Sequence, residues 1–359
     1  MTLLAPAPTP TAVRVERVTS PAPRVEWEAL TAADPTSLVD QSPGWTDVIT
    51  ASAPYRDASR LYELSDGRRF VLPLVRRRGP VRPAGLESAF PDGWGIGGLV
   101  GPHRDLSALR AVLDDLSRRR EVFTRIRPDP SEGELWNEAA PPGVVTRPKR
   151  AHVIDLRPGP DALFAAMSAS TRRNIRKAEK AGLEVTDAAT PEHLAAYYRL
   201  FELSLERWAE RSREPLRLAL WRGRRRDPLW KLQAMADRLG DQFRLWLAWQ
   251  DGDPIAGKIV LLGNTAHGTR GAMDRERAHP TRASHLVEWR AVEEAATRGC
   301  TSYHQGETGT SSSLAQFKEG FGGRSHAYED LRFERLPFTR ADVALRSAVK
   351  RAIGFRDGP

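Results

Sequence analysis

The segment that decides the fold is YHQGETGT, residues 303–310, followed after two serines by SLAQFKEGFGG, residues 313–323. The first part is a short strand-like run that ends in polar side chains, and a loop of small residues follows it. The second part has the pattern of a short helix that carries Phe317 and Lys318 and ends at a glycine pair. This order places a lysine ammonium and several polar groups around one loop, which suits a site that holds an acyl group.

Three titratable residues of this segment form the predicted catalytic group. Glu307 or His304 is positioned to accept a proton from an attacking amine or hydroxyl, and Lys318 to stabilise an oxyanion or a leaving oxygen. Each residue also has a structural alternative, such as a surface lysine or a strand histidine with satisfied hydrogen bonds. Substrate contacts are expected from Phe317 and Gln305.

Asp274 is a further candidate for a substrate contact. It follows the strand predicted over residues 265–272, so it either faces the same cleft or caps a turn.

A basic helix is predicted over residues 170–181, closed by Gly182. Residues 172, 176 and 180 share one face of this helix, and residues 173 and 177 share the next. Such a stripe suits phosphate or carboxylate contacts, although a solvated helix face has the same pattern. We expect Arg173, Arg176 and Lys177 to contact substrate, and Arg172 and Lys180 to contact phosphates.

A second basic cluster extends from Arg207 to Arg226, with three tryptophans interleaved. Arginines next to aromatic rings can bind a nucleic-acid backbone and stack on bases. At the C-terminal end of the cluster we predict phosphate contacts from Arg222, Arg224, Arg225 and Arg226. For Trp208, Trp221 and Trp230 we expect burial in the core.

Length and composition indicate an ordinary globular protein of two domains. The chain has 359 residues, 40% hydrophobic and 28% charged, with a net charge of +9 that comes mostly from arginine. The charge favours an anionic partner, although a general preference for arginine would also produce it. The histidines and the single cysteine form no metal-binding pattern, so no metal is predicted. No run of residues is apolar enough to span a membrane and the start lacks a signal peptide, so a cytoplasmic location is expected.

The order of predicted elements divides the chain into four parts. Residues 1–23 are rich in proline, alanine and threonine and are predicted to be a disordered tail. Residues 24–150 mix helices and strands. Residues 151–337 have the order strand–helix–helix–strand–strand–strand–helix–strand–helix–strand, and residues 338–359 are predicted as a basic amphipathic helix.

Two of these motifs resemble a known family. The pieces S-x-x-RN-x-RKA-x-K-x-G at 170–182 and FKEGFG at 317–322 look like the FemABX-type peptidyltransferases of the GNAT superfamily, and residues 151–336 carry the match. The resemblance implies an α/β fold of two tandem GNAT-like domains, each a mixed twisted sheet flanked by helices. It also implies that Phe317 and Lys318 are the family's Phe-Lys pair, whose lysine is placed near the tRNA end or the tetrahedral intermediate.

The resemblance also implies an activity. Members of the family transfer an amino acid from aminoacyl-tRNA, as co-substrate, to an amine of a peptidoglycan precursor or of a small molecule, and no other cofactor is expected. A coenzyme-A-dependent N-acyltransferase is the first alternative. The sequence lacks the glycine-rich loop that would bind the phosphates of coenzyme A, since residues 274–282 contain no glycine. The second alternative is a non-catalytic module that binds RNA or an anionic surface.

Overall fold

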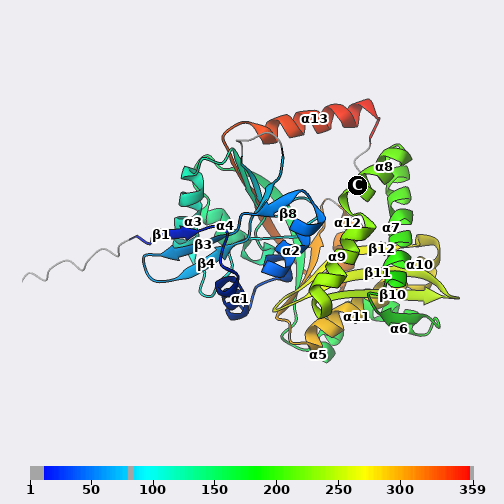
Figure 1. The fold of residues 1–359 in the computed structure, drawn as a ribbon. Helices are drawn as coiled ribbons and strands as arrows, with labels where there is room; N and C mark the ends of the chain where they lie inside the picture. The colour runs from blue at the N-terminus through cyan, green and yellow to red at the C-terminus, as the bar shows by residue number, and fades with distance from the viewer. Residues whose placement is uncertain (1–11, 80–84, 310, 356–359) are drawn as a thin grey trace, which may run out of the picture.

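The protein, described here by a computed structural model, is built on one long mixed sheet (Figure 1). The structure describes residues 12–79, 85–309 and 311–355. In this part of the chain the large sheet has 11 strands in the order β2-β5-β6-β7-β14-β8-β13-β12-β11-β10-β9, and a second sheet has the order β1-β3-β4. The two halves of the large sheet define two lobes, and helices flank both of them.

The C-terminal lobe contains the second half of the large sheet. Its strands are β9 Glu184–Asp187, β10 Phe243–Gln250, β11 Asp253–Leu262, β12 Ala266–Met273 and β13 Ser302–Glu307. Its helices are α5 Pro160–Ala166, α6 Ala169–Glu179, α7 Pro191–Ser212, α8 Leu216–Arg226, α9 Leu229–Leu239, α10 Arg275–Thr281, α11 Ala283–Thr297 and α12 Ser312–Gly320.

The N-terminal lobe contains the small sheet and the first half of the large one. Its strands are β1 Val15–Thr19, β2 Tyr55–Asp57, β3 Arg60–Leu64, β4 Arg69–Leu72, β5 Val75–Arg77, β6 Leu86–Ala89 and β7 Phe123–Ile126. Its helices are α1 Arg24–Ala33, α2 Pro43–Ser52, α3 Leu106–Arg118 and α4 Gly133–Ala139. The Asp66-Gly67 turn joins β3 to β4, as expected for a hairpin with a glycine at positive φ.

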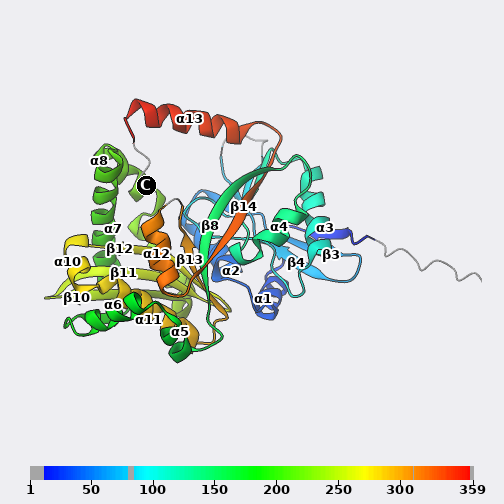
Figure 2. The ribbon, with the colours of Figure 1, turned by 180° about the vertical axis from the view of Figure 1, so that it is seen from behind.

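Two long strands join the lobes. β8 Val145–Asp155 and β14 Arg324–Glu334 pair antiparallel over nine residues, and Figure 2 shows them crossing the middle of the molecule. β14 then pairs with β7 of the N-terminal lobe, while β8 pairs with β13 of the C-terminal lobe. The predicted division between residues 150 and 151 therefore falls inside β8, at the point where this strand begins to pair with β13.

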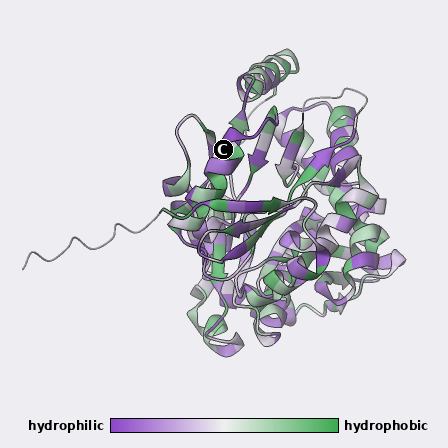
Figure 3. Cartoon of the chain, turned by 60° about the vertical axis from the view of Figure 1, so that its left-hand side comes forward, coloured by the Kyte–Doolittle hydropathy of each residue, from purple (hydrophilic) through white to green (hydrophobic). Residues whose placement is uncertain are grey.

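Hydrophobic residues cover both faces of the C-terminal half of the sheet. One core cluster packs α2, α7 and α9 against β10 and β11, and another packs α5, α6 and α11 on the opposite face. The adjacent residues Ile259 and Val260 contribute to these two cores, because successive side chains of a strand point to opposite faces. In Figure 3 green and purple segments alternate along the helices, as this packing requires of amphipathic helices.

The predicted disordered tail is wrong for residues 12–23. Val15–Thr19 forms β1, which pairs with β3. The side chains of Val15 and Val18 pack on the N-terminal core, and this contact orders the segment. Residues 1–11 lie outside the described residues. At the other end, α13 Phe338–Ala352 is the expected C-terminal helix, and both ribbon views place it across the top of the molecule. Among the described residues, no helix combines the length and apolarity that crossing a membrane requires.

Candidate active site

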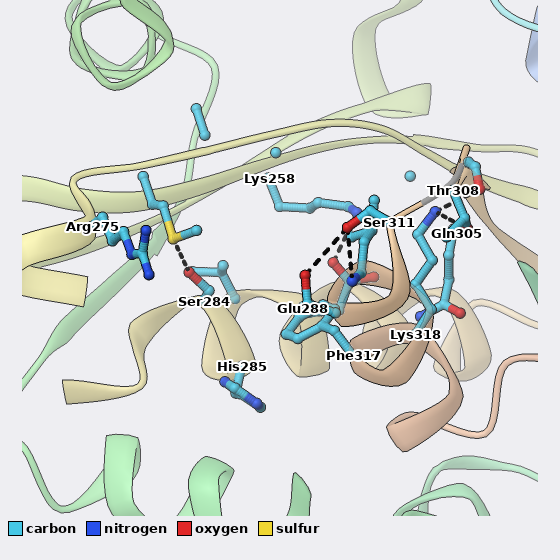
Figure 4. Close-up of a pocket in the computed structure, with 18 of the residues that line it drawn as sticks. Lys258, Arg275, Ser284, His285, Glu288, Gln305, Thr308, Ser311, Phe317 and Lys318 are labelled. Carbon is cyan, nitrogen blue, oxygen red and sulfur yellow. Dashed lines mark hydrogen bonds and ion pairs between the residues drawn. The ribbon is translucent and has the colours of Figure 1, made fainter. Parts of the chain in front are cut away.

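A cavity of about 1400 Å³ opens where two strands of the C-terminal lobe part. β12 and β13 run parallel and pair only through residues 266–267 and 303–304. Beyond these residues the strands diverge, so that residues 268–273 and 305–308 line the cavity from two sides. The start of α6, the start of α11 and helix α12 complete its walls (Figure 4).

Lys318 lies in this wall and is 5% exposed. Its Nζ donates to the backbone oxygens of Gly306 at 2.6 Å and Glu307 at 2.9 Å, and to Oγ1 of Thr308 at 3.1 Å. These contacts use the three donors of a protonated lysine. Burial and the neighbouring Lys258 lower the pKa of Lys318 to about 7. The lysine therefore holds the loop after β13, and it can change its protonation state near neutral pH.

Phe317 and Gln305 also line the cavity. The Phe317 ring packs against His285 and Phe321, with ring centroids 5.0 and 5.1 Å away. Burial and Arg282 lower the pKa of His285 to about 4, so that this imidazole is neutral at pH 7. Gln305 is 4% exposed, and neither atom of its amide has a hydrogen-bond partner in the described part of the chain. Its amide is enclosed next to Gly323, where a Cβ atom would meet the Oε1 of Gln305 at 2.1 Å.

Glu307 lines the cavity, but its carboxylate is already engaged. It lies 2.9 Å from Nζ of Lys149 and 3.3 Å from Arg127, and it accepts from the Tyr328 hydroxyl at 3.2 Å. Burial alone would raise the pKa of Glu307, but Arg127 and Lys149 hold it below its ordinary value. The residue is thus a weak proton acceptor that is positioned by the N-terminal lobe.

The structure does not bring His304 or Asp274 to the cavity lining. His304 is 1% exposed and points to the opposite face of β13 from Tyr303 and Gln305, with Nε2 3.4 Å from Asp129. Burial lowers the pKa of His304, but the Asp129 carboxylate raises it above its ordinary value. Asp274 caps α10 by accepting from the backbone N–H of Glu276, as in the turn-capping alternative.

The predicted basic helix is α6, and its two ends have different surroundings. Its first two turns contribute Thr171 and Asn174 to the cavity. The basic residues project from its other faces: Arg173, Arg176, Lys177 and Lys180 are exposed and do not line the cavity. Arg172 donates to the backbone oxygens of Ala165 and Met167, so this guanidinium closes the turn between α5 and α6.

The predicted phosphate-binding arginines lie on α8. Arg222, Arg224 and Arg226 form ion pairs with Glu214, Glu202 and Asp227, and Arg225 lies over the Trp221 ring at 5.3 Å. All four arginines are exposed.

The expectation that the three tryptophans are buried is wrong. Trp208, Trp221 and Trp230 are 45, 56 and 51% exposed. Helices α7 and α8 are in close contact: Gly223 lies so near Leu205 that a Cβ atom there would meet the Leu205 Cδ1 at 2.3 Å. Because the helices approach so closely, the larger aromatic rings remain on the surface.

Sequence reasoning missed one buried ion pair of the site. Nζ of Lys258 on β11 lies 2.8 Å from Oε2 of Glu288 on α11, and both residues are largely buried and line the cavity. The signal was present, because Lys258 is the only charged residue in the strand sequence PIAGKIVLL and Glu288 interrupts the apolar sequence LVEW. A charged residue in such a run is rarely buried without a partner or a function.

The fold of this chain is similar to folds of known proteins. Residues 165–319 match a family described as the acetyltransferase (GNAT) domain. The crystal structure of FemX has a TM-score of 0.67 at 13% identity, over 91% of this chain and 99% of FemX. A conserved protein of unknown function from Bacteroides thetaiotaomicron has a TM-score of 0.52 at 11% identity, over 87% of this chain and 97% of that one. No curated protein has a significant sequence match to the chain.

The class that this fold and site define is an acyltransferase of the GNAT fold. The resemblance to FemABX-type transferases is confirmed by the GNAT domain match and by the similarity to FemX over nearly the whole chain.

Proposed function

We propose that this protein transfers an aminoacyl group from aminoacyl-tRNA to an amine or hydroxyl of an acceptor, either a peptidoglycan precursor or a small molecule. The observation that carries the proposal is an exposed surface of arginines and tryptophans that begins at the cavity. Arg207 and Trp208 of α7 line the cavity itself, and Trp221 and Arg225 line a second hollow on the neighbouring helix α8. Figure 1 shows α7 and α8 side by side, consistent with their close packing.

Such a surface fits the single-stranded end of a tRNA. Exposed aromatic rings stack on bases, and arginines contact the phosphates between them. The Arg207 guanidinium lies 5.9 Å from the Trp208 ring and the Arg225 guanidinium 5.3 Å from the Trp221 ring, so each ring has a cation beside it. A terminal ester bound in the cavity would leave the preceding nucleotides over these rings.

The segment between β12 and α11 also supports this donor. A coenzyme A site on this fold uses a glycine-rich loop whose backbone N–H groups bind the pyrophosphate. Here Asp274 caps a short helix, α10, and Arg282 follows it with a positive φ of 63°. Helix α10 therefore occupies the position of that loop.

The residues of the cavity account for the chemistry of transfer. The acceptor amine attacks the ester carbonyl, a C–N bond forms, the tRNA hydroxyl leaves, and the amine loses a proton. Because the ester is already activated, positioning and stabilisation of the oxyanion supply most of the acceleration. Lys318 fixes the loop of residues 306–308. In the described part of the chain Glu288 is the one ion-pair partner of Lys258, which leaves Lys258 N–H donors for an oxyanion.

One observation favours an acyl-CoA donor as the second candidate. Helix α11 begins at Ala283 without a side-chain cap, and Ser284 and His285 of its first turn line the cavity. Free N–H groups at a helix N-terminus attract phosphate. The two candidates therefore differ in which phosphate-bearing molecule the cavity accepts.

The test compares the two donors directly. Melting temperature is measured with acetyl-CoA, with uncharged tRNA and with an aminoacyl-tRNA pool, each at low and moderate salt, because a ligand that binds the folded state raises it. Transfer of labelled amino acid is then measured onto amine acceptors that include a peptidoglycan-precursor peptide. Stabilisation by charged tRNA together with transfer supports the proposal, and stabilisation by acetyl-CoA alone overturns it. Binding of RNA without any transfer would instead indicate a non-catalytic module.

A further inference from the structure

A carboxylate oxygen in the cavity wall has no partner. Glu288 is 4% exposed, and its Oε2 is paired with Lys258 at 2.8 Å. Its Oε1 makes no hydrogen bond with the described residues, and neither does the hydroxyl of Tyr303. This hydroxyl is close to the carboxylate, since burial and then Glu288 raise the pKa of Tyr303 well above its ordinary value. Leaving a buried carboxylate oxygen without a donor costs free energy, so such an atom in a cavity wall indicates a ligand that supplies the donor.

A glycine of β12 lets two side chains of the cavity wall pack closely against this strand. A Cβ atom at Gly268 would lie 2.6 Å from the Tyr303 Oη and 2.8 Å from Cε of Lys258. A side chain at position 268 would therefore displace Lys258 or Tyr303. The glycine thus lets the Lys258–Glu288 pair and Tyr303 keep their positions in the wall.

The charges along the cavity differ in sign. Arginines that are exposed or half-buried line its solvent side: Arg207, Arg211, Arg275 and Arg282. Figure 4 places Glu288 between Arg275 and Lys318. A ligand that fits this order has an anionic part near the arginines and an N–H donor beside Glu288. A plain acyl group, such as acetyl, offers no donor at that position.

We propose that Oε1 of Glu288 accepts a hydrogen bond from the α-amine of the aminoacyl group, and that this contact selects aminoacyl donors over donors whose amine is blocked or missing. This inference rests on the proposed aminoacyl transfer. The α-amine of an aminoacyl ester has N–H donors in both of its protonation states, so the contact persists across neutral pH. Lys258 holds the carboxylate in place from the other side.

The test measures the preference between two donors. The same tRNA is charged with one amino acid, and half of it is N-acetylated. The ratio of kcat/KM for the free and the N-acetylated donor is the readout. A hydrogen bond to a charged group predicts a preference of about 10- to 100-fold in the wild type. A stable 3′-aminoacylamido-adenosine and its N-acetyl form, compared by calorimetry, give the same preference without turnover.

Two variants assign this preference to Glu288. In the double variant Lys258→Met/Glu288→Met both buried charges are replaced together, which avoids an unpaired buried charge. We expect it to fold, to react more slowly with both donors because Lys258 is lost, and to accept both donors within about two-fold of each other. Glu293→Gln, on the same helix but paired with Arg290 outside the cavity, is the matched control and keeps the preference.

The outcomes separate this inference from the proposed function. If aminoacyl-tRNA is used but the wild type accepts the N-acetylated donor equally well, the inference is overturned and aminoacyl transfer stands. The same holds if the double variant loses rate with both donors but keeps the full preference, because Glu288 would then act on the reaction and not on the α-amine. If no aminoacyl-tRNA is used at all, both proposals are overturned.

Discussion

The Nζ atom of Lys318 lies 3.1 Å from Oγ1 of Thr308, and this contact joins helix α12 to the loop that follows β13. The same ammonium binds the backbone oxygens of Gly306 and Glu307. Lys318 therefore fixes the backbone on one side of the cavity.

Replacement of this lysine by methionine should abolish most of the transfer. Lys318→Met removes the charge and the three hydrogen bonds that fix the loop of residues 306–308, and we expect kcat to fall by about 10²-fold, because a small misplacement of the site can cost that much. Initial rates with saturating donor check this. Ser312→Ala, an exposed position of the same helix, should keep the wild-type rate. Full turnover by a folded Lys318→Met protein would show that the lysine has no part in the reaction.

The same lysine predicts a pH dependence of stability. Burial and Lys258 lower the pKa of Lys318 to about 7, from 10.5 for an exposed lysine. Between these values the unfolded chain binds more protons than the folded protein, so the contribution of Lys318 to the unfolding free energy rises with pH, by at most about 1.4 kcal/mol per pH unit. Below pH 7 this contribution is lost. Urea denaturation of the wild type and Lys318→Met from pH 6 to 10 measures the difference, and parallel curves would contradict the lowered pKa.

The exposed surface of α8 predicts a salt-dependent effect on tRNA binding. Trp221→Ala/Arg225→Ala removes a stacking surface and the cation beside it. We expect a loss of affinity of about 1–3 kcal/mol and a decrease of about 0.7 to 0.9 in the slope of log K against log salt. Filter binding over a salt series measures both. Arg118→Ala, an exposed arginine on α3 of the other lobe, should change neither. An unchanged affinity in the double variant would remove α8 from the tRNA-binding surface.

The joint between the lobes depends on a buried ion pair. Asp330 on β14 is fully buried and accepts from Nε of Arg125 on β7 at 2.8 and 2.9 Å, and Arg332 lies 3.1 Å from it. Asp330→Asn removes the carboxylate that Arg332 pairs with and leaves Arg125 with the more exposed Asp92, so we expect the unfolding free energy to fall by about 3–5 kcal/mol. Asp342→Asn, in a more exposed pair with Arg346, should change it by less than about 1 kcal/mol. Equal urea midpoints for the two variants would contradict this role.

The sequence predicted much of the C-terminal lobe because its elements carry strong local signals. The hairpin of β10 and β11 turns at Asp251-Gly252, where both residues have positive φ, and α7 begins at Pro191 behind its cap Thr190. Phe317 and Lys318 were found because they follow a small-residue loop. Helix α10 was missed, since a helix of seven residues with Pro280 inside has little periodicity.

The rest of the site depends on contacts between distant segments. Lys258 and Glu288 are 30 positions apart, and only the packing of α11 against β11 brings them together. His304 is predicted in the site because it is a titratable residue near Glu307 and Lys318, but alternation along β13 turns it toward Asp129 of the N-terminal lobe. The tryptophans of the second basic cluster were expected inside because large apolar residues usually are, and the close approach of α7 and α8 keeps them outside.

Gly268 and Gly271 of β12 allow the effect of an added methyl group to be compared at two positions of the cavity wall. At Gly268 a Cβ atom would meet the Tyr303 Oη at 2.6 Å and Cε of Lys258 at 2.8 Å, whereas at Gly271 its nearest neighbours would lie at 3.9 Å. Gly268→Ala therefore has to displace one of these buried side chains. We expect it to lower the unfolding free energy by about 1–3 kcal/mol, as overpacking does, and to reduce kcat/KM at least 10-fold. Gly271→Ala has room for its methyl group and should retain activity within about two-fold. Because both changes add the same methyl group to the same strand, β propensity affects them alike and the difference reports the placement of Lys258 and Tyr303. Equal kcat/KM values for the two variants would show that the reaction does not depend on this placement.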